Sequence, residues 1–149
     1  MPFIHPERRM NSGGALRAFD DELPFIYTSG IRAIVSLLNL PSDASVYESA
    51  GFAHLCIPIP DGCAPTIEEA FQFVRFVDDQ LGRKQAVAVH CEGGIGRTGT
   101  MLAAYFIAHG KSARESIVRV RASEPSAVET TRQIQFLEDF QQSVAKHSS

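Results

Sequence analysis

The sequence predicts an α/β fold in which a mainly parallel sheet is flanked by helices. Short apolar runs rich in branched residues alternate along the chain with stretches of helical periodicity. The apolar run at 86–89 is followed by a glycine-rich loop and then by an apolar stretch long enough for a buried helix. The chain has 149 residues with no internal repeat and no linker, so one domain over residues 1–149 is expected.

Two strands are predicted in the first half of the chain. Residues 3–14 are expected to form a short extended piece with turns, and residues 15–29 a helical region. Residues 31–40 are rich in branched side chains and predict a core strand. A short helix up to Ala50 is expected next, and residues 52–57 are expected to form a second core strand with Cys56 in the core.

The second half begins with Thr66-Ile67-Glu68-Glu69, which has the spacing of a capping box and predicts a helix to Leu81. Ala86 to Val89 is expected to be a buried strand, and 101–108 a buried helix. A second capping box at Ser112 predicts another helix. The last helix is expected to start at Thr130, and its apolar face is formed by Ile134, Leu137, Phe140 and Val144.

The loop after the 86–89 strand combines a cysteine, glycines and an arginine. Gly93, Gly94 and Gly96 allow successive backbone N–H groups to turn inward and bind an anion at the start of a helix. Arg97 adds a planar fork that can bind two phosphate oxygens. Cys91 would lie at the base of this loop, where the same field should lower the pKa of its thiol. The pattern predicts nucleophilic phosphoryl transfer by Cys91.

The motif His90-Cys91-x5-Arg97-Thr98-Gly99 resembles the signature of the cysteine-dependent protein tyrosine phosphatases, and the chain resembles their compact dual-specificity branch. The segment 57–65 (Ile-Pro-Ile-Pro-Asp-Gly-Cys-Ala-Pro) is similar to the general-acid loop of that family. The segment 124–133 is similar to its glutamine-bearing segment. The resemblance runs from about residue 31 to residue 140.

The resemblance implies a role for each residue of the motif. Cys91 would be the nucleophile, and Arg97 would bind the phosphoryl group. Asp61 would be the general acid and then the general base, although Asp61-Gly62 taken alone is an ordinary turn. Thr98 would donate a hydrogen bond to the sulfur of Cys91. Its position at the start of a helix also fits a helix cap.

Other residues of these segments would bind substrate or support the site. Backbone groups of the loop would bind the phosphate, and this set comprises Glu92, Gly93, Gly94, Ile95 and Gly96. His90 would order the loop through hydrogen bonds. Gln133 could position the hydrolytic water and Glu129 could assist Asp61, but both also fit solvated surface positions. Cys63 could form a disulfide with Cys91 on oxidation, and the sequence leaves this open.

Composition and charge argue against several classes of partner and cofactor. The net charge of −3 gives no general reason to expect nucleic acid or an anionic membrane as a partner. No apolar run reaches the length of a membrane span, and the first residues lack the apolar core of a signal peptide. Three cysteines argue against a disulfide framework and for the reducing cytoplasm. The scattered histidines show no metal-ligand spacing, so no metal and no other cofactor are expected.

These observations together predict a monomeric cytoplasmic protein phosphatase that acts on phosphotyrosine, with phosphoserine and phosphothreonine as further candidates. The substrate would be a phosphorylated protein or peptide. A rival hypothesis is a phosphatase of RNA 5′ ends, phosphoinositides or small phosphate esters, although the loop carries Glu92 instead of the lysines that polyanionic substrates favour. A phosphate-binding module without turnover is a second rival hypothesis, and a different thiol chemistry such as arsenate reduction is a third.

Overall fold

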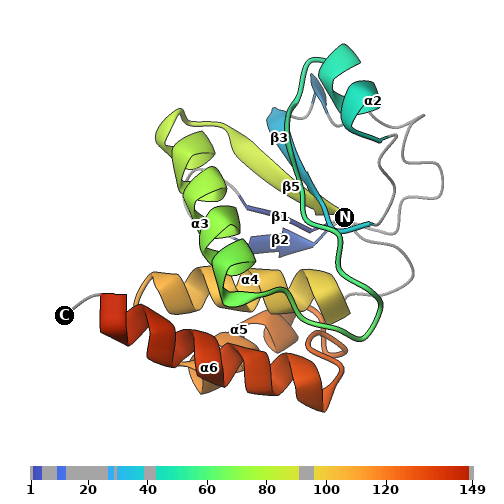
Figure 1. Ribbon diagram of the computed structural model, residues 1–149. Helices are drawn as coiled ribbons and strands as arrows, with labels where there is room; N and C mark the ends of the chain where they lie inside the picture. Colours follow the sequence, from blue (N-terminus) through green and yellow to red (C-terminus); the bar gives the residue numbers. More distant parts are fainter. Residues whose placement is uncertain are drawn as a thin grey trace.

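The computed structural model describes residues 2–4, 10–12, 27–28, 30–38, 43–90 and 96–147 (Figure 1). Within these residues the protein is a single layer of sheet with helices on both faces. Most of the predicted helical region at 15–29 lies outside the described residues, and so do Cys91, Glu92, Gly93, Gly94 and Ile95.

The sheet has five strands in the order β2-β1-β5-β3-β4. These are β1 (Pro2–Ile4), β2 (Met10–Ser12), β3 (Ile31–Ser36), β4 (Ala53–Cys56) and β5 (Ala86–His90). The strands β5, β3 and β4 are parallel, whereas β1 is antiparallel to both β5 and β2. The predicted α/β class is confirmed, with an antiparallel pair of short strands at one side of the parallel set.

In the described chain α2 (Asp43–Ser49) and α3 (Ile67–Gly82) alternate with the parallel strands, and three helices follow β5: α4 (Gly96–Ala108), α5 (Ala113–Ser123) and α6 (Thr131–His147). The helix α4 packs against α3, α5 and α6, and it is buried along most of its length. Its composition explains this position, because small and apolar residues from Met101 to Ala104 leave no polar face for solvent.

The two faces of the sheet bury two separate cores. Ala33 and Val35 of β3 point into the larger core with α3, α4, α5 and α6. Ile34, between them, points into a smaller core with Tyr47 of α2 and with Phe52. This alternation follows from the two-residue period of a strand. It places α2 on the opposite side of the sheet from the other helices (Figure 1).

The predicted core strand at 52–57 is an edge strand. The four residues of β4 are exposed or half-buried, because the described sheet ends at β4, which pairs only with β3. Phe52 and Ile57, which flank β4, are buried and supply the apolar signal. Cys56 is exposed, which corrects the expectation of a core cysteine.

Helix ends agree closely with the sequence signals. Thr66 and Glu69 form the full reciprocal capping box at the start of α3. At the start of α5 the Ser112 hydroxyl accepts from the Glu115 N–H at 3.1 Å.

At the end of α3 the Gln85 N–H bonds to the Gln80 carbonyl, and the Lys84 N–H bonds to the Leu81 carbonyl. These two bonds form a Schellman motif with Lys84 in the left-handed position.

Lys84 is exposed and has a φ of 61°, a conformation that costs a residue with a Cβ roughly 1–2 kcal/mol. The same motif ends α4, where the left-handed residue is Gly110 with a φ of 103°. We predict that Lys84→Gly raises the free energy of unfolding by about 1 kcal/mol, measured by urea denaturation. The control is Lys84→Ala, which removes the charge but keeps the Cβ and should not stabilise the protein. Equal effects of both substitutions would contradict the prediction.

Candidate active site

The segment that follows β4 is aligned with the end of β5 through β3. The Ile57 N–H bonds to the Ser36 carbonyl at 2.9 Å, and the Ile59 N–H bonds to the Leu37 carbonyl at 3.1 Å. The Leu37 N–H in turn bonds to the carbonyl of His90, the last residue of β5, at 2.8 Å. These bonds extend the parallel ladder beyond the strands. They place the segment 57–66, called the acid loop below, at the carboxyl edge of the sheet, where such sheets bind ligands.

Arg97, the second residue of α4, reaches the acid loop. Its side chain is 11% exposed, its Nη1 donates to the Ile59 carbonyl at 2.9 Å, and its Nε lies 3.9 Å from Asp61 Oδ1. The Asp61 side chain is 90% exposed. In Figure 1 the acid loop runs past the starts of α4 and α6 before it enters α3. Two residues predicted for the site, Arg97 and Asp61, therefore lie together.

The connection between α5 and α6 also lies against the start of α4. A Cβ atom added to Gly99 would lie 2.6 Å from the Ala127 Cβ, so the two segments approach as closely as glycine permits. A Cβ atom added to Gly96 would lie 3.0 Å from the Glu129 carboxyl carbon. Glu129 is exposed, and its carboxylate borders Gly96, the first residue of α4.

Arg121 holds this connection in place. Its Nε donates to the Ala127 carbonyl at 2.9 Å, and its Nη2 donates to the Val128 carbonyl at 2.7 Å. Val128 has a φ of 60°, which is rare for a β-branched residue and is maintained here by the surrounding contacts. Arg121 was not predicted from the sequence, because no short-range pattern distinguishes it from the other arginines of α5.

Gln133 is fully buried, and both ends of its amide are engaged. Its Oε1 accepts from the Glu129 N–H at 2.8 Å and from the Thr130 N–H at 3.1 Å, and its Nε2 donates to the Cys63 carbonyl at 3.2 Å. One interpretation of the sequence was that Gln133 is a solvated helix residue, and its burial shows that this interpretation is wrong. The water-positioning role stays a prediction, and it would require the amide to exchange one of these partners.

Thr130 is a residue of this region that the sequence predicted only as a helix start. Its hydroxyl accepts from the Gln133 N–H at 3.2 Å and donates to the Gly62 carbonyl at 2.9 Å. Thr130-x-x-Gln133 has capping-box spacing, so this half of its role was readable from the sequence. The bond to Gly62 was not, because it joins residues 68 positions apart.

Thr98 is the third residue of α4 and is 2% exposed. The interpretation of Thr98 as the helix cap is therefore wrong, because the helix begins two residues earlier. His90 is half-buried at the end of β5, and its backbone carbonyl takes part in the extended ladder. The predicted roles of Thr98 and His90 toward Cys91 remain predictions, since Cys91 lies outside the described residues.

Cys63, two residues after Asp61, is half-buried, and its sulfur lies 3.4 Å from Arg132 Nη1. Its pairing with Cys91 on oxidation stays a prediction. Asp78, on α3, contacts two side chains at the far end of α4. It accepts from the Tyr105 hydroxyl at 3.1 Å and contacts His109 Nε2 at 2.9 Å. Asp78 thus joins α3 to the far end of α4.

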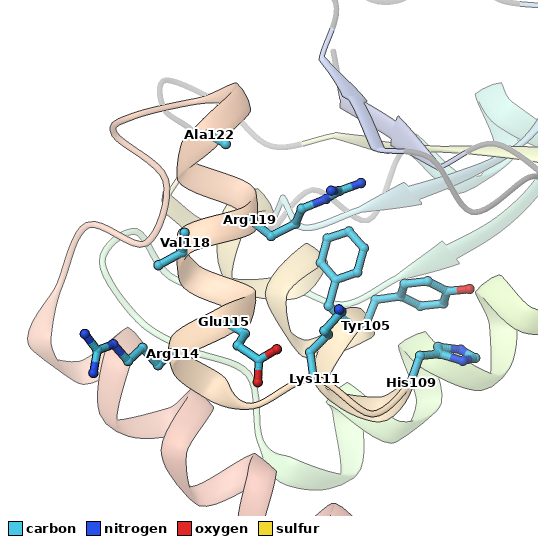
Figure 2. Close-up of a pocket in the computed structure, with 9 residues that line it drawn as sticks. Tyr105, His109, Lys111, Arg114, Glu115, Val118, Arg119 and Ala122 are labelled. Carbon is cyan, nitrogen blue, oxygen red and sulfur yellow. The ribbon is translucent and has the colours of Figure 1, made fainter.

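A groove lies between the second half of α4 and α5 (Figure 2). Phe106 lies beside it nine residues after Arg97, about 14 Å along the helix axis. None of the predicted site residues lines this groove.

In the part of the chain that the structure describes, no group of three His, Cys, Asp or Glu residues could hold a metal ion. No helix there is long and apolar enough to cross a membrane.

Comparisons with known proteins place the chain in a family. The family model described as "Polymorphic toxin system, DSP-PTPase phosphatase" matches residues 9–111. The dual specificity protein phosphatase CDC14AB of Danio rerio is 31% identical over 144 residues, which are 96% of this chain and 23% of that protein. The tyrosine-protein phosphatase cdc-14 of Caenorhabditis elegans is 34% identical over 83% of this chain and 17% of its own length. The chain therefore spans about a quarter or less of these curated relatives.

Among solved structures, Tk-PTP in its active form has a TM-score of 0.78 and is 32% identical, with 87% of this chain and 89% of that chain covered. The kinase associated phosphatase, with its catalytic-site cysteine replaced by serine, has a TM-score of 0.80 at 19% identity, which shows a shared fold. The motif, the fold and the family model agree, and the chain belongs to the DSP-PTPase phosphatases, the dual-specificity branch of the cysteine-dependent protein tyrosine phosphatase superfamily.

Proposed function

We propose that this chain is a protein phosphatase that hydrolyses phosphotyrosine through a phosphocysteine on Cys91. The observation that carries the proposal is the meeting of Arg97 and Asp61 at the start of α4. A phosphate-binding cation and a carboxyl group that can transfer a proton are the two groups that phosphoester cleavage needs beside its nucleophile. Family membership supports the assignment of the nucleophile to Cys91.

In the first step the Cys91 thiolate attacks phosphorus, and the bond from phosphorus to the ester oxygen breaks. The Asp61 carboxyl group gives its proton to the departing oxygen. Backbone N–H groups of residues 92–96 and the guanidinium of Arg97 stabilise the equatorial oxygens, where charge gathers in the transition state. The first turn of α4 begins at Gly96, so its N-terminus adds a positive partial charge at this place.

In the second step water attacks the phosphocysteine, and the Asp61 carboxylate takes a proton from that water. The sulfur–phosphorus bond breaks, which releases phosphate and regenerates the thiolate. Thr98 donates a hydrogen bond to the departing sulfur, and His90 orders the loop. Glu129 assists Asp61, a role that its position beside Gly96 supports. No metal takes part, because the arginine and the backbone N–H groups neutralise the phosphate.

The charges beside the described part of the site favour a phosphoprotein over a polyanionic substrate. Asp61 and Glu129 are exposed carboxylates near Arg97 and Gly96, and Glu92 adds a third acidic residue in the loop. A second or third phosphate group would meet repulsion here. We propose a monomeric cytoplasmic enzyme that acts on phosphorylated proteins without a nucleic acid or membrane partner.

The mechanism predicts a graded response to three substitutions. Cys91→Ser should abolish release of phosphate from 4-nitrophenyl phosphate, because the nucleophile is lost. Arg97→Ala should lower kcat/KM by about 10²–10³-fold, and Asp61→Ala should lower kcat on a phosphotyrosine peptide by about 10²–10⁴-fold. Steady-state kinetics with EDTA present measures all three. The control is Asp79→Ala, which should leave the kinetics unchanged because the Asp79 carboxylate on α3 pairs at 3.3 Å with Arg83, the residue that caps the end of that helix.

Two results would overturn this assignment. If the wild-type protein is inert but still binds phosphopeptides, the chain is a binding module. If EDTA removes the activity and added metal restores it, the metal-free mechanism is wrong.

Substrate class provides a second prediction. A phosphotyrosine peptide should have a higher kcat/KM than a phosphatidylinositol phosphate or a 5′-phosphorylated RNA, because the acidic groups repel polyanions. Glu129→Gln should shift the ratio of kcat/KM values toward the polyanions, and a neutral exposed control, Gln135→Ala, should not. The substrate assignment fails if a polyanion is the best substrate and the ratio does not respond to Glu129.

A further inference from the structure

The acid loop is joined to the start of α6 by side chains that lie outside the loop. The Thr130 hydroxyl donates to the Gly62 carbonyl at 2.9 Å, and Gln133 Nε2 donates to the Cys63 carbonyl at 3.2 Å. These carbonyls belong to the two residues that directly follow Asp61. The backbone beside the general acid is therefore held by a helix that begins about 70 residues later in the chain.

The same two side chains cap α6. The Thr130 hydroxyl accepts from the Gln133 N–H, and the Gln133 amide oxygen accepts from the Thr130 N–H. Each side chain thus has one partner in the helix cap and one in the acid loop. Because the helix fixes the rotamers of these side chains, it also fixes the positions of the carbonyls that they bind.

The start of α6 is itself anchored to α4. Ala127 packs against Gly99, and Arg121 binds the carbonyls of Ala127 and Val128. The path of contacts runs from α4 through Ala127 to Thr130 and from there to the loop carrying Asp61. Since α4 also carries Arg97, the path relates the position of the general acid to that of the phosphate-binding arginine.

The Asp61 carboxylate has little support of its own in the described structure. Its side chain is 90% exposed, and its Oδ1 lies 3.9 Å from Arg97 Nε. An ion pair at this distance with so exposed a carboxylate contributes little rigidity. The position of the carboxyl group therefore depends on the backbone of Gly62 and Cys63.

We infer that Thr130, together with Gln133, is a positioning residue that holds Asp61 where it can give its proton to the leaving oxygen. The inference rests on the proposed role of Asp61 as general acid. Proton donation matters most when the leaving group is a strong base, and it matters little for a nitrophenolate, which leaves as a stable anion. Loss of the Thr130 bond should therefore affect substrates unequally.

The experiment compares kcat/KM on phenyl phosphate and on 4-nitrophenyl phosphate. Thr130→Val removes the hydroxyl with little change of shape, and Thr130→Asp keeps a cap acceptor but cannot donate to Gly62 when ionised. Both variants should lower the ratio of phenyl to nitrophenyl kcat/KM by about tenfold, a fraction of the full effect of losing the general acid. Thr130→Ser keeps both bonds and should retain the wild-type ratio.

Two controls separate the tether from the helix cap and from the acid itself. Ser112→Ala removes the cap of α5, which should lower the stability of the fold but leave the ratio unchanged. Asp61→Asn gives the full loss of proton donation, against which the Thr130 variants are scaled. Thermal unfolding of each variant confirms that the folded protein is being measured.

The inference is overturned if Thr130→Val and Thr130→Asp leave the ratio unchanged while Asp61→Asn lowers it. It is also overturned if Thr130→Ser lowers the ratio as much as Thr130→Val. If Asp61→Asn itself leaves the ratio unchanged, the assignment of the general acid fails and the inference falls with it. The Asp61 variant thus distinguishes the two failures.

Discussion

The close approach of Ala127 to Gly99 is the contact on which the arrangement of the site depends. A side chain at Gly99 would fall 2.6 Å from the Ala127 Cβ and 3.1 Å from backbone atoms of the same connection, so any larger residue would push the connection away from α4. The connection carries Glu129 and leads into Thr130, and its displacement would move both. Glycine in a helix interior costs roughly 1 kcal/mol relative to alanine. Here the cost is offset by the packing that the missing side chain permits.

The acid loop shows how the backbone beside an exposed carboxylate can be held by buried neighbours. Ile57, Ile59 and Pro65 are buried, and backbone hydrogen bonds join Ile57 and Ile59 to the end of β3. The contacts with α6 hold the loop at its middle. Asp61 lies between these supports and faces solvent, where a substrate can approach it. Side chains of rigid elements that hold a loop in this way favour a preorganised site over one that forms on binding.

The described unit recurs in proteins of very different length. It covers nearly all of Tk-PTP in the solved structure, whereas it covers about a quarter of the CDC14 relatives. The sheet, α4 and the connection to α6 supply the arginine, the acid loop and its supports within the described residues. Large additional segments are therefore not needed to bring these groups together. The functions of the additional segments are properties of those relatives, because function depends on the site and not on the fold alone.

Local patterns were sufficient to predict the α/β class and most of the described helices and parallel strands. The capping box at Thr66, the apolar strand at 86–89 and the helix after the glycines all depend on neighbours within a few positions, and each is present in the structure. The edge position of β4 was not readable, because burial of Phe52 and Ile57 gives the same apolar signal as a central strand. Likewise, the left-handed conformation of Lys84 could not be predicted from the sequence, because the residue in this position of a Schellman motif is usually glycine.

The sequence by itself determined the chemistry that we propose for this protein, because a cysteine, glycines and an arginine at fixed spacing are neighbours along the chain. The tertiary structure decided which distant residues support that chemistry. Thr130 reaches Gly62, Gln133 reaches Cys63, and Arg97 reaches Ile59 across separations of 68, 70 and 38 residues. Such contacts depend on how helices pack on the sheet. That packing follows from the burial of both apolar faces of the sheet, and it cannot be predicted from a local sequence pattern.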